Sequence, residues 1–284
     1  MLKHIGEALA VVAISVLVML SGVGGAEAAT PINSCGTLSV ADTYRLTANL
    51  SISSGDCLIV AANSVTIDLN GFEISGNGTS DNGVTDGGSA RKDIVVRDGT
   101  IRGFPVAGIA LGLSTASLVD GLVLFDNGRA VTVGAGGTVK NSTMHDNTSA
   151  NAATITVNGA GTVTDNVLVN NVASNANGHS ILAGPHALVS GNTLIYNNSF
   201  FGIAAAHNST VKNNVVSHNT NGSGAIVVNG HSVIVQNTVL NNTGFGFLIV
   251  CPSTVKFNTA LNNGSTNLFE GGTGNCTNVG NNAP

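Results

Sequence analysis

Two stretches in the C-terminal half, VKNNVVSHNTNGSGAI (residues 211–226) and IVQNTVLNNTGFGF (residues 234–247), repeat one pattern and decide the fold. In each, an aliphatic residue stands three places before an Asn, an apolar residue stands two places after it, and a second Asn follows at the fifth place. A further apolar residue, Ile226 or Phe247, closes the unit. Because alternate residues of a strand face the same side, this spacing predicts short strands separated by Asn-containing turns.

The same unit recurs along most of the chain. Its turn position is held by Gly or Ser in the first units and by Asn in the later ones, at intervals of 21 to 28 residues: Gly71, Gly99, Gly121, Ser142, Asn166, Asn192, Asn214, Asn237 and Asn258. From the closing apolar residue to the next turn position the spacing is 11 or 12 residues, whereas from the turn to the closing residue it varies from 10 to 15. One side of each coil therefore has a nearly fixed length and the other carries insertions, which is typical of a parallel β-helix.

We therefore predict an all-β fold, a right-handed parallel β-helix of roughly nine coils with about three short strands per coil. Gly and Asn suit the turns because both tolerate positive φ. Asn side chains stacked about 4.8 Å apart can form an amide ladder, which we expect along Asn166, Asn192, Asn214, Asn237 and Asn258. Leucine-rich repeats would require a leucine-based frame, and a left-handed hexapeptide helix would require a short constant sub-period, which the variable segment contradicts.

The composition excludes several other classes of protein. Only 9% of residues are charged, 43% are hydrophobic and the mean hydropathy is +0.31, so the chain is not intrinsically disordered. The 37 glycines and the many asparagines disfavour a helical bundle. The net charge of −5 provides no basic surface, so we expect no nucleic-acid partner.

The N-terminus has the layout of a secretory signal peptide. A polar start containing Lys3 precedes an apolar run at residues 8–20, and Ala26-Glu27-Ala28 matches a small-residue cleavage site. The run is too short to span a hydrocarbon core of ~30 Å. We expect a secreted, extracellular or periplasmic protein that leaves the membrane once the signal is removed. The expected organisation is a signal peptide at 1–29, an N-terminal cap and first coil at 30–62, the β-helix at 63–270 and a Gly/Asn-rich tail at 271–284.

Four cysteines lie in two pairs at opposite ends of the repeat region: Cys35 with Cys57, and Cys251 with Cys276. In the predicted stack about eight coils at ~4.8 Å each separate the two pairs. This separation is far greater than the ~6 Å between Cα atoms that a disulfide allows. Export to an oxidising compartment favours disulfide formation. We therefore predict the bonds Cys35–Cys57 and Cys251–Cys276, one at each end.

The repeats NNVVSHN (213–219) and NTVLNN (237–242), with the earlier coils TIDLNG (66–71) and VRDGTIRGF (96–104), resemble parallel β-helix repeats of the pectin-lyase-like superfamily over roughly residues 60 to 270. The resemblance implies the fold. It leaves the activity open, because the superfamily includes lyases, hydrolases, epimerases, phage tailspikes and adhesins. The polygalacturonase motifs Asn-Thr-Asp, Asp-Asp, Gly-His-Gly and Arg-Ile-Lys and the Asp-Pro-His motif of alginate epimerases are absent from the sequence.

Charged residues concentrate in the N-terminal half, with only three beyond residue 165. In the repeat alignment Asp98 and Asp120 hold the same position in adjacent coils, Arg102 follows four residues after Asp98, and His145 falls in the column of Arg102. Close carboxylates share a proton or hold a cation. The resemblance implies that, in a lyase, such a cluster binds Ca²⁺, so Asp98 and Asp120 are the candidate Ca²⁺ ligands and Asp98, Asp120 and Arg102 the candidate catalytic residues.

Other features favour a protein without catalysis. Asp in a turn usually bonds to its own backbone, and an exposed Arg–Asp pair is usually only solvated. There is no Trp and there are only 2 Tyr to stack on sugars, and the histidines lack the spacing of metal ligands. We therefore predict an exported, non-catalytic protein without cofactor or metal that binds a polysaccharide or cell-surface glycan, at the cell surface or in the matrix. The alternative is a lyase or hydrolase of an acidic polysaccharide, whose site residues would line an open cleft.

Overall fold

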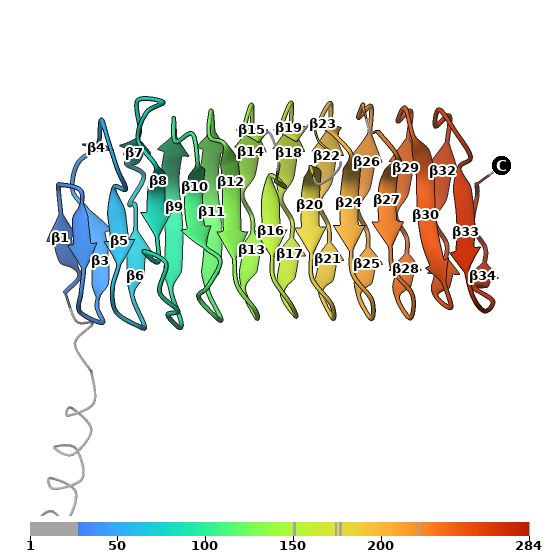
Figure 1. The fold of residues 1–284 in the computed structure, drawn as a ribbon, viewed down its shortest axis with the longest axis horizontal. Helices are drawn as coiled ribbons and strands as arrows, with labels where there is room; N and C mark the ends of the chain where they lie inside the picture. The colour runs from blue at the N-terminus through green and yellow to red at the C-terminus, as the bar shows by residue number, and fades with distance from the viewer. Residues whose placement is uncertain (1–27, 150–151, 174, 176–177, 221, 284) are drawn as a thin grey trace, which may run out of the picture.

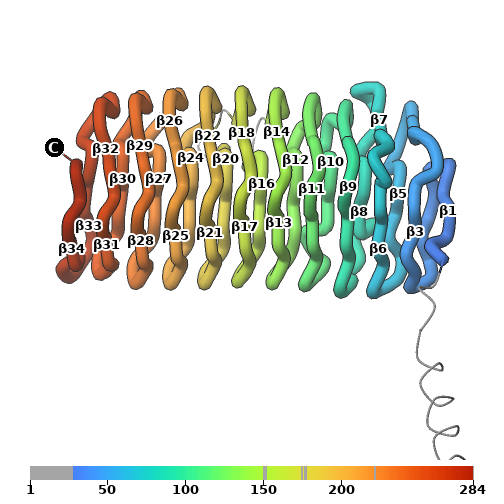
Figure 2. Tube along the Cα trace, turned by 180° about the vertical axis from the view of Figure 1, so that it is seen from behind, coloured from blue at the N-terminus to red at the C-terminus, as the bar shows by residue number. Residues whose placement is uncertain are grey.

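The fold is a stack of coils built from strands alone. The computed structural model describes residues 28–149, 152–173, 175, 178–220 and 222–283, and none of these lies in a helix. The expected signal peptide at 1–29 falls almost wholly outside these ranges. Figure 1 shows the coils side by side in one row from β1 (Thr30–Ile32) to β34 (Thr277–Val279), and Figure 2 shows the same row from behind. The predicted all-β parallel β-helix is confirmed.

All strand pairings within the described ranges are parallel, and the largest sheet has two arms that join in the long strands β9 (Val95–Arg102) and β11 (Leu118–Phe125). Besides the N-terminal parts of these two, the first arm comprises β1, β3 (Thr43–Leu46), β6 (Thr66–Asp68), β13 (Thr138–Lys140), β17 (Thr162–Thr164), β21 (Leu188–Ser190), β25 (Thr210–Lys212), β28 (Val233–Val235), β31 (Thr254–Lys256) and β34. Besides their C-terminal parts, the second arm comprises β4 (Leu50–Ser51), β7 (Glu73–Ser75), β14 (Thr143–His145), β18 (Val167–Val169), β22 (Thr193–Ile195), β26 (Val215–Ser217), β29 (Thr238–Leu240) and β32 (Thr259–Leu261).

The remaining strands form an 11-stranded sheet and a small 3-stranded sheet. The 11-stranded sheet comprises β2 (Gly36–Leu38), β5 (Leu58–Val60), β8 (Asn82–Thr85), β10 (Ala107–Leu111), β12 (Arg129–Val133), β16 (Ile155–Val157), β20 (His179–Ala183), β24 (Phe201–Ala205), β27 (Gly224–Val228), β30 (Phe245–Cys251) and β33 (Leu268–Gly272). The small sheet comprises β15 (Thr148–Ser149), β19 (Val172–Ala173) and β23 (Asn198–Ser199).

Both ends of the chain contribute more strands to the stack than the sequence predicts. Residues 30–62 supply β1 to β5, which pair in parallel with the following coils. The segment 271–284, expected to be a tail, contributes β34, which pairs with β31. The stack is therefore longer than the roughly nine coils expected.

Aliphatic columns fill the interior. The closing apolar residues of the repeats stand in register on successive strands of the 11-stranded sheet: Ile109, Val131, Ile155, Ile181, Ile203, Ile226, Phe247 and Leu268. All but Leu268, in the last coil, are buried. Aliphatic residues from every side of the coil are buried together and form one continuous core. Burial of apolar surface contributes roughly 25 cal/mol per Å² to the stability of the stack.

Two Asn ladders run along the corners, and the predicted one lies between the two arms of the large sheet. In it, the side-chain Nδ2 and the backbone N–H of Asn166 both donate to Oδ1 of Asn192 at 3.0 Å, and Nδ2 also donates to the carbonyl of Val139 at 2.9 Å. The bonds repeat through Asn192, Asn214, Asn237, Asn258 and Asn281. The second ladder follows the second arm through Asn127, Asn147, Asn171, Asn197, Asn219, Asn242 and Asn263.

The ladder asparagines do not themselves adopt positive φ, contrary to the expectation. The residue before each one does, as in Asp165 (φ 56°) before Asn166 and Tyr196 (φ 57°) before Asn197. The left-handed residue bends the chain at the corner, and the following Asn side chain then points inward, where it satisfies backbone groups that would otherwise be buried without partners.

The strand pairing corrects the sequence alignment in one coil. The alignment puts Gly121 at the turn position of Gly99, whereas the structure pairs Leu122 with Gly99, so that Gly121 stands opposite Asp98. Gly121 and Asp98 both have positive φ, 64° and 60°. The run at 118–125 is apolar at both parities, so either register satisfies its hydrophobic pattern. The shift moves Asp126 out of the second ladder and puts Asn127 there instead.

The two predicted disulfides are confirmed. Cys35 is bonded to Cys57 and Cys251 to Cys276, with Cα–Cα distances of 4.6 and 5.0 Å. Each joins neighbouring coils near one end of the stack, where a coil has a neighbour on one side only. No helix in the described ranges is long and apolar enough to span a membrane.

Candidate functional site

The structure does not assemble the candidate catalytic residues Asp98, Asp120 and Arg102 into one site. Asp98 lies one place out of register with Asp120, and its Oδ2 is 3.7 Å from Nε of Arg97. Oδ2 of Asp120 lies 3.2 Å from Nζ of Lys140. Arg102 pairs with a glutamate of the second arm instead. The expected stacking of Asp98 on Asp120 is therefore wrong, because the alignment of that coil is shifted by one residue.

Asp120 belongs to a row of alternating charges on the outer face of the first arm. The row consists of Arg45, Asp68, Arg97, Asp120 and Lys140, which occupy one register position on successive coils. The buried carboxylate of Asp68 lies 3.1 Å from both Arg45 and Arg97. Opposite charges directly across a strand pair favour that pairing. This row therefore specifies the register of the N-terminal coils, which is a structural role for Asp120.

The expected Ca²⁺ ligands Asp98 and Asp120 do not form a compact group of donors. Among the described residues, the His, Cys, Asp and Glu side chains that come close enough together to hold one ion are Cys251, Glu270 and Cys276. Both cysteines of this group are in the C-terminal disulfide, so they offer no thiolate ligand. Ca²⁺ prefers six or more oxygen ligands, which this group does not supply.

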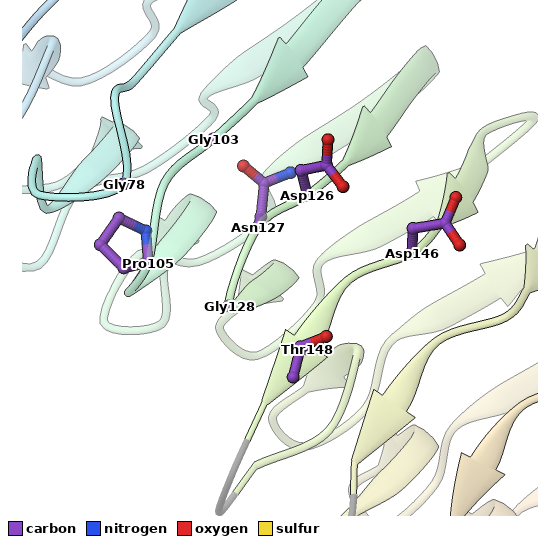
Figure 3. Close-up of a pocket in the computed structure, with 8 residues that line it drawn as sticks. All are labelled: Gly78, Gly103, Pro105, Asp126, Asn127, Gly128, Asp146 and Thr148. Atoms are coloured by element: carbon purple, nitrogen blue, oxygen red, sulfur yellow. The ribbon is translucent and has the colours of Figure 1, made fainter.

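An open cleft of about 460 Å³ crosses the corner that follows the second arm. It is lined by Gly78, Gly103, Pro105, Asp126, Asn127, Gly128, Asp146 and Thr148, drawn in Figure 3. These residues follow β7, β9, β11 and β14, so the cleft spans consecutive coils. Asp126 and Asp146 project from neighbouring coils on the same side (Figure 3). Neither Asp98, Asp120 nor Arg102 is among the lining residues.

Close backbone packing and the second ladder form the floor of the cleft. A Cβ on Gly128 would stand 2.1 Å from the carbonyl oxygen of Pro105, and a Cβ on Gly103 would stand 2.6 Å from that of Gly76. Only glycine allows so close an approach between coils. Buried Asn127 accepts a hydrogen bond at 3.1 Å from the backbone N–H of Phe104. The floor is therefore fixed before any ligand arrives.

A stack of planar side chains stands next to the cleft, on the outer face of the second arm, directly before Asp126 and Asp146 in the chain. Arg102, Phe125 and His145 hold one register position on successive coils, which confirms the expected alignment of Arg102 with His145. The guanidinium of Arg102 lies 5.8 Å from the centre of the Phe125 ring, and the Phe125 and His145 rings stack at 4.9 Å with an angle of 7°. Nη2 of Arg102 lies 2.9 Å from Glu73, and Nδ1 of His145 lies 2.8 Å from Asp146.

The charges of this stack leave the neighbouring cleft acidic. Hydrogen bonding to Glu73 and its negative charge raise the pKa of Arg102 above its ordinary value, and the charge of Asp126 acts in the same direction. The positive charge of Arg102 is thus already balanced by Glu73. The carboxylate of Asp126 makes no hydrogen bond or ion pair with another described residue, and its side chain is exposed. The site thus offers carboxylate acceptors beside the partly exposed rings of Phe125 and His145, which stack on one another.

The sequence analysis singled out His145 but missed the cleft and Phe125. A usable signal was present, because the dipeptide Asp126-Asn127 recurs one coil later as Asp146-Asn147. Aligning the two dipeptides would have corrected the register and brought Phe125 beside His145 on one outer face.

A buried histidine on the 11-stranded sheet makes stability depend on pH. His179 is 8% exposed, its ring stacks on Phe201 at 5.3 Å, and its Nδ1 has no hydrogen-bond partner. Burial lowers the pKa of His179, so the unfolded chain binds its proton at higher pH than the folded chain does. The free energy of unfolding should therefore fall as pH drops below about 6.5, by at most about 1.4 kcal/mol per pH unit for one proton.

The check is urea denaturation between neutral and mildly acidic pH for the wild type and for His179→Phe. The variant should lose part of the pH dependence, whereas a His186→Phe control, which changes an exposed histidine, should keep it. Equal slopes for the wild type and His179→Phe would contradict the assignment.

The coils, ladders and parallel sheets together define a right-handed parallel β-helix protein. The chain matches the family model described as "Right handed beta helix region" over residues 133–283. This match covers more than half of the chain, and the protein belongs to that family.

Two solved structures from Azotobacter vinelandii share the fold. The A-module of the mannuronan C-5 epimerase AlgE4 is 16% identical, with a TM-score of 0.54 over 84% of this chain and 86% of that one. The A-module of the mannuronan C-5 epimerase AlgE6 is 18% identical, with a TM-score of 0.53 over 85% of this chain and 91% of that one. At these identities the likeness concerns the fold. No curated protein matches the sequence.

Proposed function

We propose that the protein is an exported, non-catalytic β-helix that binds a polysaccharide in the cleft beside Phe125. The observation that carries the proposal is the stacked Phe125–His145 pair standing next to exposed carboxylates. Sugar rings carry C–H groups that pack against aromatic side chains, here against the ring edges because His145 and Arg102 lie over the faces of Phe125, and hydroxyls that donate to carboxylates. The two similar folds are epimerases of mannuronan, a polysaccharide, which supports a ligand of this class. The two disulfides support export to an oxidising compartment.

The test is binding to an array of neutral and uronate polysaccharides, followed by titration of those that bind. Phe125→Ala should weaken binding about tenfold, because it removes one planar contact surface. Phe269→Ala is the control, since it deletes a phenyl ring that is 46% exposed on the 11-stranded sheet, outside the cleft lining. No binding by the wild type, or equal affinities of Phe125→Ala and wild type, would contradict the proposal.

A polysaccharide-active enzyme is the second candidate, favoured by the two carboxylates that line one cleft. Asp126 and Asp146 could supply an acid and a base there, with His145 as the partner of Asp146. The discriminating measurement is turnover of uronate polymers with added Ca²⁺ and of neutral glucans without it. Turnover that is lost in Asp126→Asn would establish the enzyme, and binding without turnover would favour the first proposal.

A further inference from the structure

The corner that carries the cleft continues towards the C-terminus as a row of exposed side chains. Each is the left-handed residue before a member of the second ladder, and the first six are Asp126, Asp146, Asn170, Tyr196, His218 and Asn241. Their backbone N–H groups, from Asp146 onward, each donate to the next coil, so the six stand on consecutive coils. We call these six residues the corner row. At about 4.8 Å per coil, Asp126 and His218 are separated by about 19 Å.

Tyr196 is a bulky residue at a position of the corner row whose backbone conformation does not favour one. It is 60% exposed and has φ 57°, a conformation that disfavours bulky residues and that Asp and Asn tolerate well. An exposed ring at this position gains little from burial to offset the strain. The corner imposes this conformation on the residue that stands there, as it does on Phe257 (φ 53°), and so holds the ring of Tyr196 out in solvent, where a ligand can reach it.

The ring of Tyr196 has polar neighbours along the row. It contacts the ring of His218 at 5.5 Å between centroids, with the planes tilted by 47°. Nε2 of His218 lies 3.3 Å from Nδ2 of Asn241. Beside them, the outer face of the second arm continues from His145 as Val169 and Ile195, which are partly exposed. The row thus combines an aromatic platform, hydrogen-bonding groups and an apolar border, as the cleft does.

We infer that one linear, neutral polysaccharide chain lies along the corner row, held in the cleft at Asp126 and Asp146 and on a second platform at Tyr196 and His218. This inference rests on the proposed function and adds the ligand's direction, length and charge class. The coils repeat along the stack axis, so a ligand that follows the row meets similar groups at regular intervals.

The charges around the corner row favour a neutral polysaccharide over a polyuronate. The corner row contains no Lys or Arg, and Arg102, which stands beside the cleft, is paired with Glu73. The carboxylates of a polyuronate would stand against those of Asp126 and Asp146, and like charges at close range repel. Neutral hydroxyl groups would instead donate hydrogen bonds to both side chains.

The experiment is isothermal titration with neutral glucan oligosaccharides, namely cello-, laminari- and malto-oligosaccharides from disaccharide to octasaccharide, and with oligogalacturonates of the same lengths. Wild-type affinity should rise with length in one neutral series. Tyr196→Asn, which places in the row a residue found there at two other coils, should abolish this rise and weaken octasaccharide binding about tenfold, with disaccharide binding unchanged. Phe125→Ala should weaken binding at every length.

Phe257→Asn is the matched control, because Phe257 is also aromatic, exposed (56%) and left-handed (φ 53°) but precedes a member of the first ladder. It should leave every affinity unchanged. A length dependence that survives Tyr196→Asn, or binding confined to oligogalacturonates, would overturn the inference while leaving the cleft intact. No binding of any polysaccharide or oligosaccharide would overturn the proposed function and this inference together.

Discussion

Replacing Asn192 by Ala should lower the free energy of unfolding by about 3–5 kcal/mol. Oδ1 of Asn192 accepts from both the backbone N–H and Nδ2 of Asn166, and its Nδ2 donates to Oδ1 of Asn214 and to the carbonyl of Val163. Asn192 is fully buried, so water cannot replace these bonds. A buried polar group left without its partner costs about 1–3 kcal/mol, and more than one is left here.

The measurement is the urea midpoint, together with hydrogen exchange of the coils around Asn192. Exchange should rise most in these coils, because each coil of a solenoid contacts only its neighbours. Asn158→Ala is the control, since Asn158 is exposed at a turn outside the ladders and should change stability by less than about 0.5 kcal/mol. Asn192→Asp should also destabilise, because it sets an oxygen against the Val163 carbonyl. A loss below about 1 kcal/mol in Asn192→Ala would show that the ladder contributes little.

Most of the fold could be predicted because each coil repeats the same physical requirements. The sequence alignment of the column from Ile109 to Leu268 is correct. Each coil has one apolar residue there, at a nearly constant distance before the next turn. Register within a strand failed where the chain around Gly121 is apolar at both parities. There the charge row through Arg97 and Asp120 decides the pairing, and charges across strands are not visible until the register is known.

The candidate site could be predicted much less well, because it depends on that register. A shift of one residue exchanges the inner and outer faces of a strand, so the alignment placed Val123 in the core column and Leu124 on the surface. In the structure Leu124 is buried, and Phe125 stands outside against His145. The loop glycines at the floor of the cleft also gave no signal, because their role depends on distances between coils.

Replacing Phe104 by Ala should lower the free energy of unfolding by about 3–5 kcal/mol and also weaken polysaccharide binding. Phe104 is fully buried, and its ring lies where added Cβ atoms on Gly76 and Gly83 would approach within 2.9 and 3.1 Å. Removing the ring leaves a cavity among residues that cannot fill it. Phe104 also immediately precedes Pro105, which lines the cleft, so the floor should loosen.

Phe247→Ala separates the two effects of this substitution. Phe247 is 1% exposed and belongs to the core near the opposite end of the stack, so its loss should cost a similar free energy. Because coils communicate mainly with their neighbours, Phe247→Ala should leave the affinity of the cleft for disaccharides unchanged at a temperature where both variants are folded. Urea denaturation and titration of the two variants provide the comparison. Equal losses of affinity would mean that binding follows global stability, and the cleft beneath Asp126 would then not be the binding site.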